Sequence, residues 1–187
     1  MEENIIEKVR EFVEEEHGRP SAKYGREIYE FHILPMVNCS LELAEKGGGD
    51  LEIVELSVLL HDIGSVIHGR ENHHITGAEI AERKLRELGY SEDKIKKVKS
   101  CILSHRGSQP INGESLEAKI ISDADAISCF DNLSGSFKAT LVYEGLTQGE
   151  AKVSVREKLQ RKWSKLYLEE SKKRVKPKYE AVMLLLK

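Results

Sequence analysis

The stretch from Leu51 to Gly64, LEIVELSVLLHDIG, places the strongest constraint on the fold of this chain. Its apolar residues fall on every side of a helical projection, so it is predicted to form a helix that is buried nearly all round. The helix is expected to end with His61 and Asp62, polar groups that a core rarely hides unless they are paired or bound to a metal. Gly64 is interpreted as its C-terminal cap. An adjacent imidazole and carboxylate can give a divalent cation one nitrogen and one oxygen ligand.

The remaining apolar residues also recur with helical spacing. Helices are predicted over residues 2–16, 21–46, 76–88, 91–105 and 116–133, and in the tail around 155–166 and over 179–186. Pro35 is expected to kink the second of these near His32, because proline lacks a main-chain donor. Thr76, followed three residues later by Glu79, predicts a capping box at the start of the helix over 76–88. Since no alternating pattern typical of strands appears, we predict an all-α fold, a single compact multi-helix bundle over residues 1–187.

The composition excludes several classes of protein. Hydrophobic residues make up 40% and charged residues 33% of the chain, as in soluble globular proteins. No apolar stretch approaches the roughly 20 residues that cross a bilayer, and the N-terminus does not resemble a secretory signal. A cytoplasmic protein without a membrane partner is therefore expected. Cys39, Cys101 and Cys129 are odd in number and far apart, which predicts buried free thiols rather than disulfides.

The charge is distributed unevenly along the chain. Residues 152–187 contain 12 Lys or Arg against 4 Glu, although the whole chain carries a net charge of -3. Such a basic segment can bind phosphates or an acidic partner. It more often forms the solvated face of a helix, so nucleic-acid binding is not expected. If nucleic acid did bind there, its affinity would fall steeply with salt.

Several of the seven histidines lie on separate predicted helices, together with aspartates. His32 lies in an early helix, His61 and Asp62 end the central one, His105 ends a later one, and Asp125 lies in the helix after that. A single core histidine is usually satisfied by a hydrogen bond. The combination of imidazoles and carboxylates favours a divalent metal site instead.

The order of these residues resembles the HD-domain superfamily of metal-dependent phosphohydrolases. The resemblance rests on His32, on LLHDIG, on HHITGAEIAERKL from His73, on ILSH ending at His105, and on DADAI from Asp123. These motifs define a core of about residues 31–130, and residues 136–187 form a helical C-terminal extension. The chain departs from many members at Ser65, where they have a lysine that could contact phosphate.

The resemblance implies one divalent metal ion (Mn, Fe, Co, Ni or Mg) held by His32, His61, Asp62 and Asp125. Asp125 is chosen because Ala-Asp followed by a residue and an aliphatic is the common form of the family's last motif. Helical spacing leaves Asp123 as an alternative, since it shares an apolar face with Leu116, Ile120 and Ile127. The face of Asp125 is apolar as well, with Ala118, Ile121 and Cys129.

The resemblance also implies hydrolysis of a small phosphorylated substrate, expected to be a nucleotide, by metal-activated water. Asp62 is the predicted catalytic residue, and His74, His105 and Arg106 are predicted to face the substrate phosphate. A single ion is expected because no extra carboxylate is available to bridge two.

In the alternative interpretation, His73 is solvent-exposed and His105 is a packed core residue. A regulatory module that binds metal or nucleotide without turnover is the alternative function, and homo-oligomerisation is left open.

Overall fold

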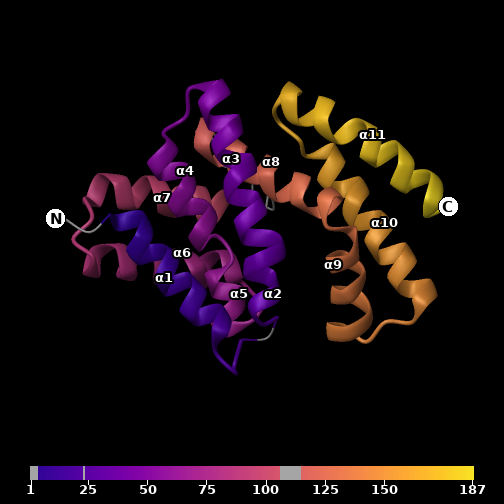
Figure 1. Ribbon diagram of the computed structural model, residues 1–187, viewed down its shortest axis with the longest axis horizontal. Helices are drawn as coiled ribbons and strands as arrows, with labels where there is room; N and C mark the ends of the chain where they lie inside the picture. The colour runs from indigo at the N-terminus through magenta and orange to yellow at the C-terminus, as the bar shows by residue number, and fades with distance from the viewer. Residues whose placement is uncertain (1–3, 23, 106–114) are drawn as a thin grey trace. The chain divides into compact units, whose positions relative to one another are not determined.

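The computed structural model describes residues 4–22, 24–105 and 115–187, and every regular element within these ranges is helical (Figure 1). The predicted all-α fold is therefore confirmed. No helix within these ranges is long and apolar enough to span a membrane. The three cysteines are free and buried, as predicted.

The chain packs into two compact units, with the boundary between Ser122 and Asp123. The first contains α1 (Ile5–Gly18), α2 (Arg26–Ile28), the π-helix η1 (Tyr29–Ile33), α3 (Leu34–Gly47), α4 (Leu51–Leu60), α5 (Ile63–His68), α6 (His73–Glu87) and α7 (Glu92–Ser104). Helix α8 (Leu116–Asp131) runs across the boundary. The second unit continues with α9 (Leu133–Lys138), the π-helix η2 (Ala139–Tyr143), α10 (Gln148–Ser164) and α11 (Glu169–Leu185). The assignment of the whole chain to one domain stays a prediction.

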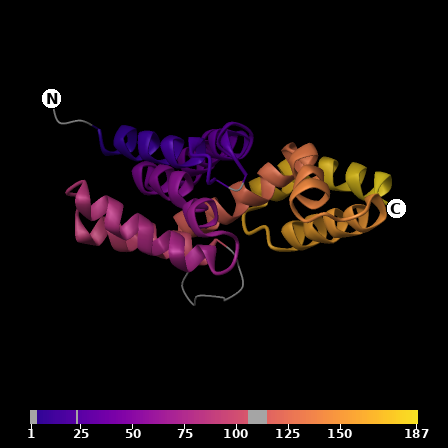
Figure 2. The ribbon, with the colours of Figure 1, turned by 90° about the horizontal axis from the view of Figure 1, so that it is seen from below.

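Helix α4 is the centre of the first unit. Nearly all of its residues after the first turn are buried, which confirms the prediction from its apolar sequence. Asp50 caps its N-terminus, where the carboxylate accepts a hydrogen bond from the main-chain N–H of Ile53 at 3.3 Å. Helices α1, α3 and α7 pack against α4 (Figure 1). Helices α6 and α7 lie side by side (Figure 2).

The predicted disturbance near His32 takes the form of a π-helical turn. The chain passes from α2 into η1 and then into α3, and Pro35 lies in the first turn of α3. A proline is tolerated there because its missing N–H would not bond within that helix. Such π-turns often occur at functional sites. Here the turn carries His32 and Tyr29.

The last helix of the second unit is longer than predicted. Helix α11 starts at Glu169 and contains Pro177, so the expected short helix over 179–186 is wrong. Val175 and Val182 are buried on either side of the proline, and this packing holds the helix together despite one lost hydrogen bond. Trp163 of α10 stacks on Tyr179 of α11, with ring centroids 4.8 Å apart. Propensity alone therefore placed the helix start too late.

Candidate metal centre

The end of α4 presents His61 and Asp62, as predicted. His61 is buried at the C-cap of α4, and Asp62 is the N-cap residue of α5. Helix α5 follows directly and continues to His68. The interpretation of Gly64 as a helix cap is therefore wrong. It lies inside α5, where α6 comes so close that a Cβ on Gly64 would sit 2.3 Å from the main-chain oxygen of His73.

One carboxylate oxygen of Asp62 faces a first pair of histidines. Oδ2 lies 3.5 Å from Nε2 of His61 and 3.9 Å from Nε2 of His32. The two Nε2 atoms are 3.4 Å apart. These three side chains could hold a cation between them. They come from η1 and from the junction of α4 with α5.

The other carboxylate oxygen of Asp62 faces a second pair. Oδ1 lies 3.3 Å from Nε2 of His73 and 3.8 Å from Nε2 of His105. The two Nε2 atoms are 3.3 Å apart. His73 is the first residue of α6, and His105 is the C-cap of α7. Asp62 is therefore shared by two groups of potential ligands.

Main-chain carbonyls fix which nitrogen of these rings carries the proton. Nδ1 lies 2.8 Å from the oxygen of Val58 in His61, 2.9 Å from that of Arg70 in His73, and 2.6 Å from that of Ile102 in His105. A carbonyl oxygen can only accept, so each Nδ1 is the donor. In a neutral ring, Nε2 then carries the lone pair.

The same tautomers place no proton between the two Nε2 atoms of the second pair. Nε2 of His73 and Nε2 of His105 direct lone pairs at each other across 3.3 Å, and neither has a proton to donate when both rings are neutral. A cation between two such nitrogens turns a repulsive arrangement into a favourable one. Hydrogen bonds from Nδ1 to main-chain carbonyls are also typical of histidines that ligate metals. These residues therefore fit a divalent cation.

The charge of Asp62 is maintained by its neighbours. Burial raises the pKa of this carboxyl, but the four histidines together outweigh burial and hold the pKa well below its ordinary range. Asp62 is therefore an anion at neutral pH. An ionised carboxylate together with imidazole nitrogens is the donor set that borderline divalent metals prefer.

The structure brings together most of the residues predicted in the first unit. His32, His61, Asp62 and His105 lie in the two groups, as does His73, which was not chosen. His74 belongs to neither group, and Arg106 lies outside the described residues.

His73 was missed because the start of its helix was placed too late. Helix α6 begins at His73 after Asn72, whose φ of 52° is left-handed, so the predicted capping box at Thr76 is wrong. The first turn aims His73 at Asp62, and its side chain is only 12% exposed, which overturns its interpretation as solvent-exposed. Gly64, which lets α5 and α6 approach closely, is the sequence signal that could have indicated this.

The two aspartates of the DADAI segment have different partners within the second unit. Asp123 is buried and accepts hydrogen bonds from the main-chain N–H groups of Tyr167 at 2.8 Å and Leu168 at 2.9 Å. Burial raises the pKa of Asp123. These hydrogen bonds lower it, but burial has the larger effect. Asp125 accepts a hydrogen bond from Nζ of Lys162 through Oδ2. Asp123 thus holds the segment that leads into α11, and Asp125 forms an ion pair with α10.

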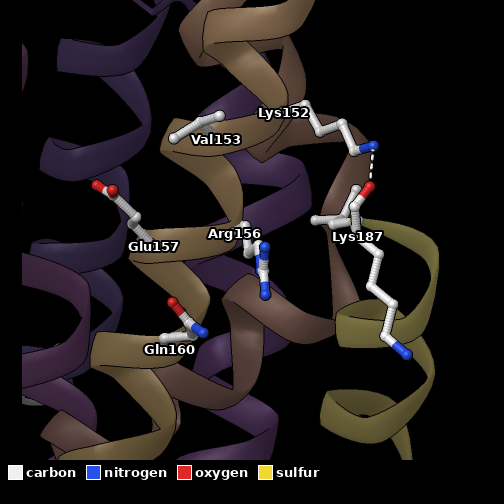
Figure 3. A pocket seen from close by; sticks show the side chains of 7 residues that line it. Lys152, Val153, Arg156, Glu157, Gln160 and Lys187 are labelled. Carbon is white, nitrogen blue, oxygen red and sulfur yellow. Dashed lines mark hydrogen bonds between the residues drawn. The ribbon is translucent and has the colours of Figure 1, made fainter.

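The second unit also contains an open cavity of about 460 Å³ (Figure 3). It is lined by Lys152, Val153, Arg156, Glu157, Gln160, Leu186 and Lys187. Nζ of Lys152 donates a hydrogen bond to the main-chain oxygen of Lys187 at its edge (Figure 3). None of the predicted site residues lines this cavity, so its volume does not mark the metal centre.

The chain is similar to proteins of known sequence and to solved structures. Ribonuclease Y of Sulfurimonas denitrificans is 31% identical over 112 residues, which are 59% of this chain and 19% of that protein. The match thus spans about a fifth of its length. An HD-superfamily hydrolase of Bacillus thuringiensis superposes with a TM-score of 0.74 at 19% identity, covering 100% of this chain and 95% of that one. Bacillus subtilis YpgQ in complex with ADP gives 0.70 at 18% identity, covering 96% and 92%. These two structures show a shared fold.

The family follows from the sequence match and agrees with the site. The family model of the HD domain matches residues 29–129, more than half of the chain, and this range includes every member of the two groups around Asp62. The chain belongs to the HD-domain family.

Proposed function

We propose that this protein is a metal-dependent phosphohydrolase that acts on a small phosphorylated substrate, a nucleotide. The observation that carries the proposal is the position of Asp62, with one carboxylate oxygen facing His32 and His61 and the other facing His73 and His105. Divalent cations bound in this way supply two things: a lower pKa for water, and neutralisation of charge on a phosphoryl group.

We further infer that the centre could hold two cations, one with His32 and His61 and one with His73 and His105, with Asp62 as the residue common to both groups. The expectation of a single ion assumed that no carboxylate could bridge, but each oxygen of Asp62 has its own pair of imidazoles. Asp125 is the proposed additional ligand, as in the sequence prediction. Asp123 is less suited to this role because both of its oxygens accept main-chain hydrogen bonds. Titration with Mn²⁺ followed by calorimetry would give the stoichiometry, one or two ions per chain.

The protein side chains would prepare the site for hydrolysis. Main-chain carbonyls hold His61, His73 and His105 in the tautomer in which Nδ1 carries the proton and Nε2 the lone pair that a cation would use. Asp62 is the proposed residue that orients the attacking water, since its side chain is 28% exposed and carries the charge of the centre. His74 and Arg106 are retained as proposed phosphate contacts.

The nucleotide assignment is supported by the relatives. YpgQ was crystallised with ADP, and ribonuclease Y is named for action on RNA, which also presents phosphoryl groups attached to nucleosides. The shared chemistry is a phosphoryl group next to a nucleoside. We propose the same substrate class for this chain.

The test is phosphate or nucleoside release from a panel of nucleoside mono-, di- and triphosphates and cyclic diesters with added Mn²⁺. Each reaction is run beside a sample containing a chelator. Turnover of one class that stops with the chelator is the expected result, and it names the substrate group. Folded, metal-loaded protein that turns over no member of the panel would overturn the proposal in favour of a regulatory module.

The two aspartates of α8 provide a matched pair of substitutions. Asp125→Asn retains an oxygen for Lys162 but loses the negative charge, so Mn²⁺ affinity and turnover are expected to fall together, each by at least about 100-fold. Asp123→Asn turns an NH₂ group toward one of the two main-chain N–H donors, so the free energy of unfolding is expected to fall by about 1–3 kcal/mol. Calorimetry with Mn²⁺ and urea unfolding measure the two effects. An Asp125→Asn protein that binds metal and turns over like the wild type would assign the ligand role elsewhere.

A further inference from the structure

The open cavity of the second unit is a binding site candidate that the metal centre does not use. It lies between α10 and the two residues that follow α11, and its volume of about 460 Å³ is within the usual range of small-molecule sites. All of its lining residues belong to the second unit, so the cavity is complete within that unit. It shares no residue with the two groups around Asp62.

Arg156 lines this cavity, and no carboxylate among the described residues forms an ion pair with it. Glu157, the next residue of α10, instead lies 3.7 Å from Nη1 of Arg161. Nε of Arg156 is fully buried and has no hydrogen-bond partner in the described part of the chain. The two Nη groups are therefore the donors that a molecule in the cavity can reach. In Figure 3 the side chain of Arg156 lies between those of Gln160 and Lys187.

Two lysines add positive charge to the same cavity. Nζ of Lys152 donates a hydrogen bond to the main-chain oxygen of Lys187, and the side chain of Lys187 lines the cavity as well (Figure 3). Together with Arg156, three cationic side chains stand against the carboxylate of Glu157, an excess of two positive charges. Such an excess favours an anionic ligand.

The charge and the lining of the cavity favour a phosphomonoester as this anion. A phosphomonoester carries a charge of about −1.5 to −2 at neutral pH, close to the excess in the cavity, whereas a carboxylate carries a single charge. The planar guanidinium of an arginine can donate to two phosphoryl oxygens at once. Val153 and Leu186 offer apolar surface, and Gln160 offers an amide, to the organic part of the ligand.

We propose that this cavity binds a small organic phosphomonoester. The Nη groups of Arg156 donate to the phosphoryl oxygens, Lys187 supplies a second cation, and Val153 and Leu186 contact the organic part. The site does not depend on the proposed phosphohydrolase activity, because none of its residues belongs to the metal centre.

Nitrogen NMR of the arginine side chains tests the site in the full chain without added metal. On titration with inorganic phosphate, the Nε signal of Arg156 is expected to shift and to saturate. Ribose 5-phosphate is expected to bind more tightly than inorganic phosphate because it has an organic part. Acetate at the same ionic strength is expected to bind more weakly because it carries one charge. An Arg156 signal that phosphate leaves unchanged, or acetate that binds as tightly as phosphate, would overturn the proposal.

Two substitutions that each remove one positive charge separate the cavity from the general charge of the unit. Arg156→Gln removes the charged donor pair, so the affinity for phosphate is expected to fall by at least about 10-fold. Lys176→Gln is the matched control, since Lys176 is 66% exposed, lies 4.0 Å from Glu180 and does not line the cavity. Its affinity is expected to change by less than about twofold. Equal losses in both variants would contradict a specific site.

Asp62→Ala separates this site from the metal centre, where phosphate is also expected to bind. The shift of the Arg156 signal with phosphate is expected to be the same in this variant as in the wild type. Its disappearance in Asp62→Ala would assign the phosphate to the metal centre and reject the inference. Phosphate binding at Arg156 in a protein that hydrolyses no member of the substrate panel would support the inference and reject the phosphohydrolase.

Discussion

Replacing Asp62 by alanine is expected to remove metal from both pairs of histidines at once. Each pair depends on one oxygen of this carboxylate, so no anionic ligand of the first unit remains at either position. Metal catalysis of phosphoryl transfer contributes several kcal/mol, and about 1.4 kcal/mol corresponds to a tenfold change in rate. Turnover is therefore expected to fall by at least about 1000-fold. Metal analysis of the purified protein and the rate with the best substrate of the panel check this result.

His73→Ala is the matched control for Asp62→Ala. It removes a ligand from the second pair only, so the position formed by His32 and His61 is expected to keep its ion. The stoichiometry should then drop from two ions to one in His73→Ala and to none in Asp62→Ala. If the Asp62→Ala protein retained its metal, the carboxylate could not be the shared ligand. Loss of all metal from the His73→Ala protein would show that the two positions do not fill independently.

The second large effect is expected for Gly64→Ala, a substitution that changes no charge. An added Cβ would lie 2.3 Å from the main-chain oxygen of His73 and 2.5 Å from the main-chain nitrogen of Gly77. Main-chain atoms cannot rotate away as a flexible side chain can, so α5 and α6 must separate. Overpacking usually lowers the free energy of unfolding by about 1–3 kcal/mol. Because this clash is with main-chain atoms, we expect a loss of about 3 kcal/mol or more. Urea unfolding of the metal-free protein measures the loss.

Gly77→Ala is the control on the facing helix. Its Cβ would lie 3.4 Å from the main-chain nitrogen of Gly64 and 3.5 Å from the main-chain oxygen of His61, which are ordinary contacts. Alanine also favours a helix interior over glycine by about 0.5–1 kcal/mol. The free energy of unfolding is therefore expected to change by less than about 1 kcal/mol. Similar losses in both variants would mean that the close approach is not specific to Gly64.

Gly64→Ala should also weaken the metal centre, because His73 lies at the start of the helix that must move. The position that contains His73 and His105 is expected to lose affinity more than the position that contains His32 and His61. This difference links the glycine to the geometry of the site rather than to stability alone. Equal loss of affinity at the two positions in the Gly64→Ala protein would contradict this link.

Helical periodicity was a reliable guide where burial is uniform or one-sided. The apolar residues of α4 correctly predicted its burial. Pro35 indicated the place of the disturbance, although only the structure shows that it is a π-helical turn. Local signals failed at Thr76, at Gly64 and at Pro177. At each of these positions, packing against another helix outweighs the preference of the residue itself.

The sequence by itself determined the fold class, the family and the greater part of the candidate centre, because helical periodicity and short motifs are local properties of the chain. Only the tertiary structure decided that His73 rather than His74 faces Asp62, and that Asp62 offers one oxygen to each pair of histidines. It also revealed the different partners of Asp123 and Asp125. These features depend on rotations about helix axes and on close approaches between segments distant in sequence. Such quantities are determined by the packing of the whole unit, and no spacing of residues along one helix specifies them.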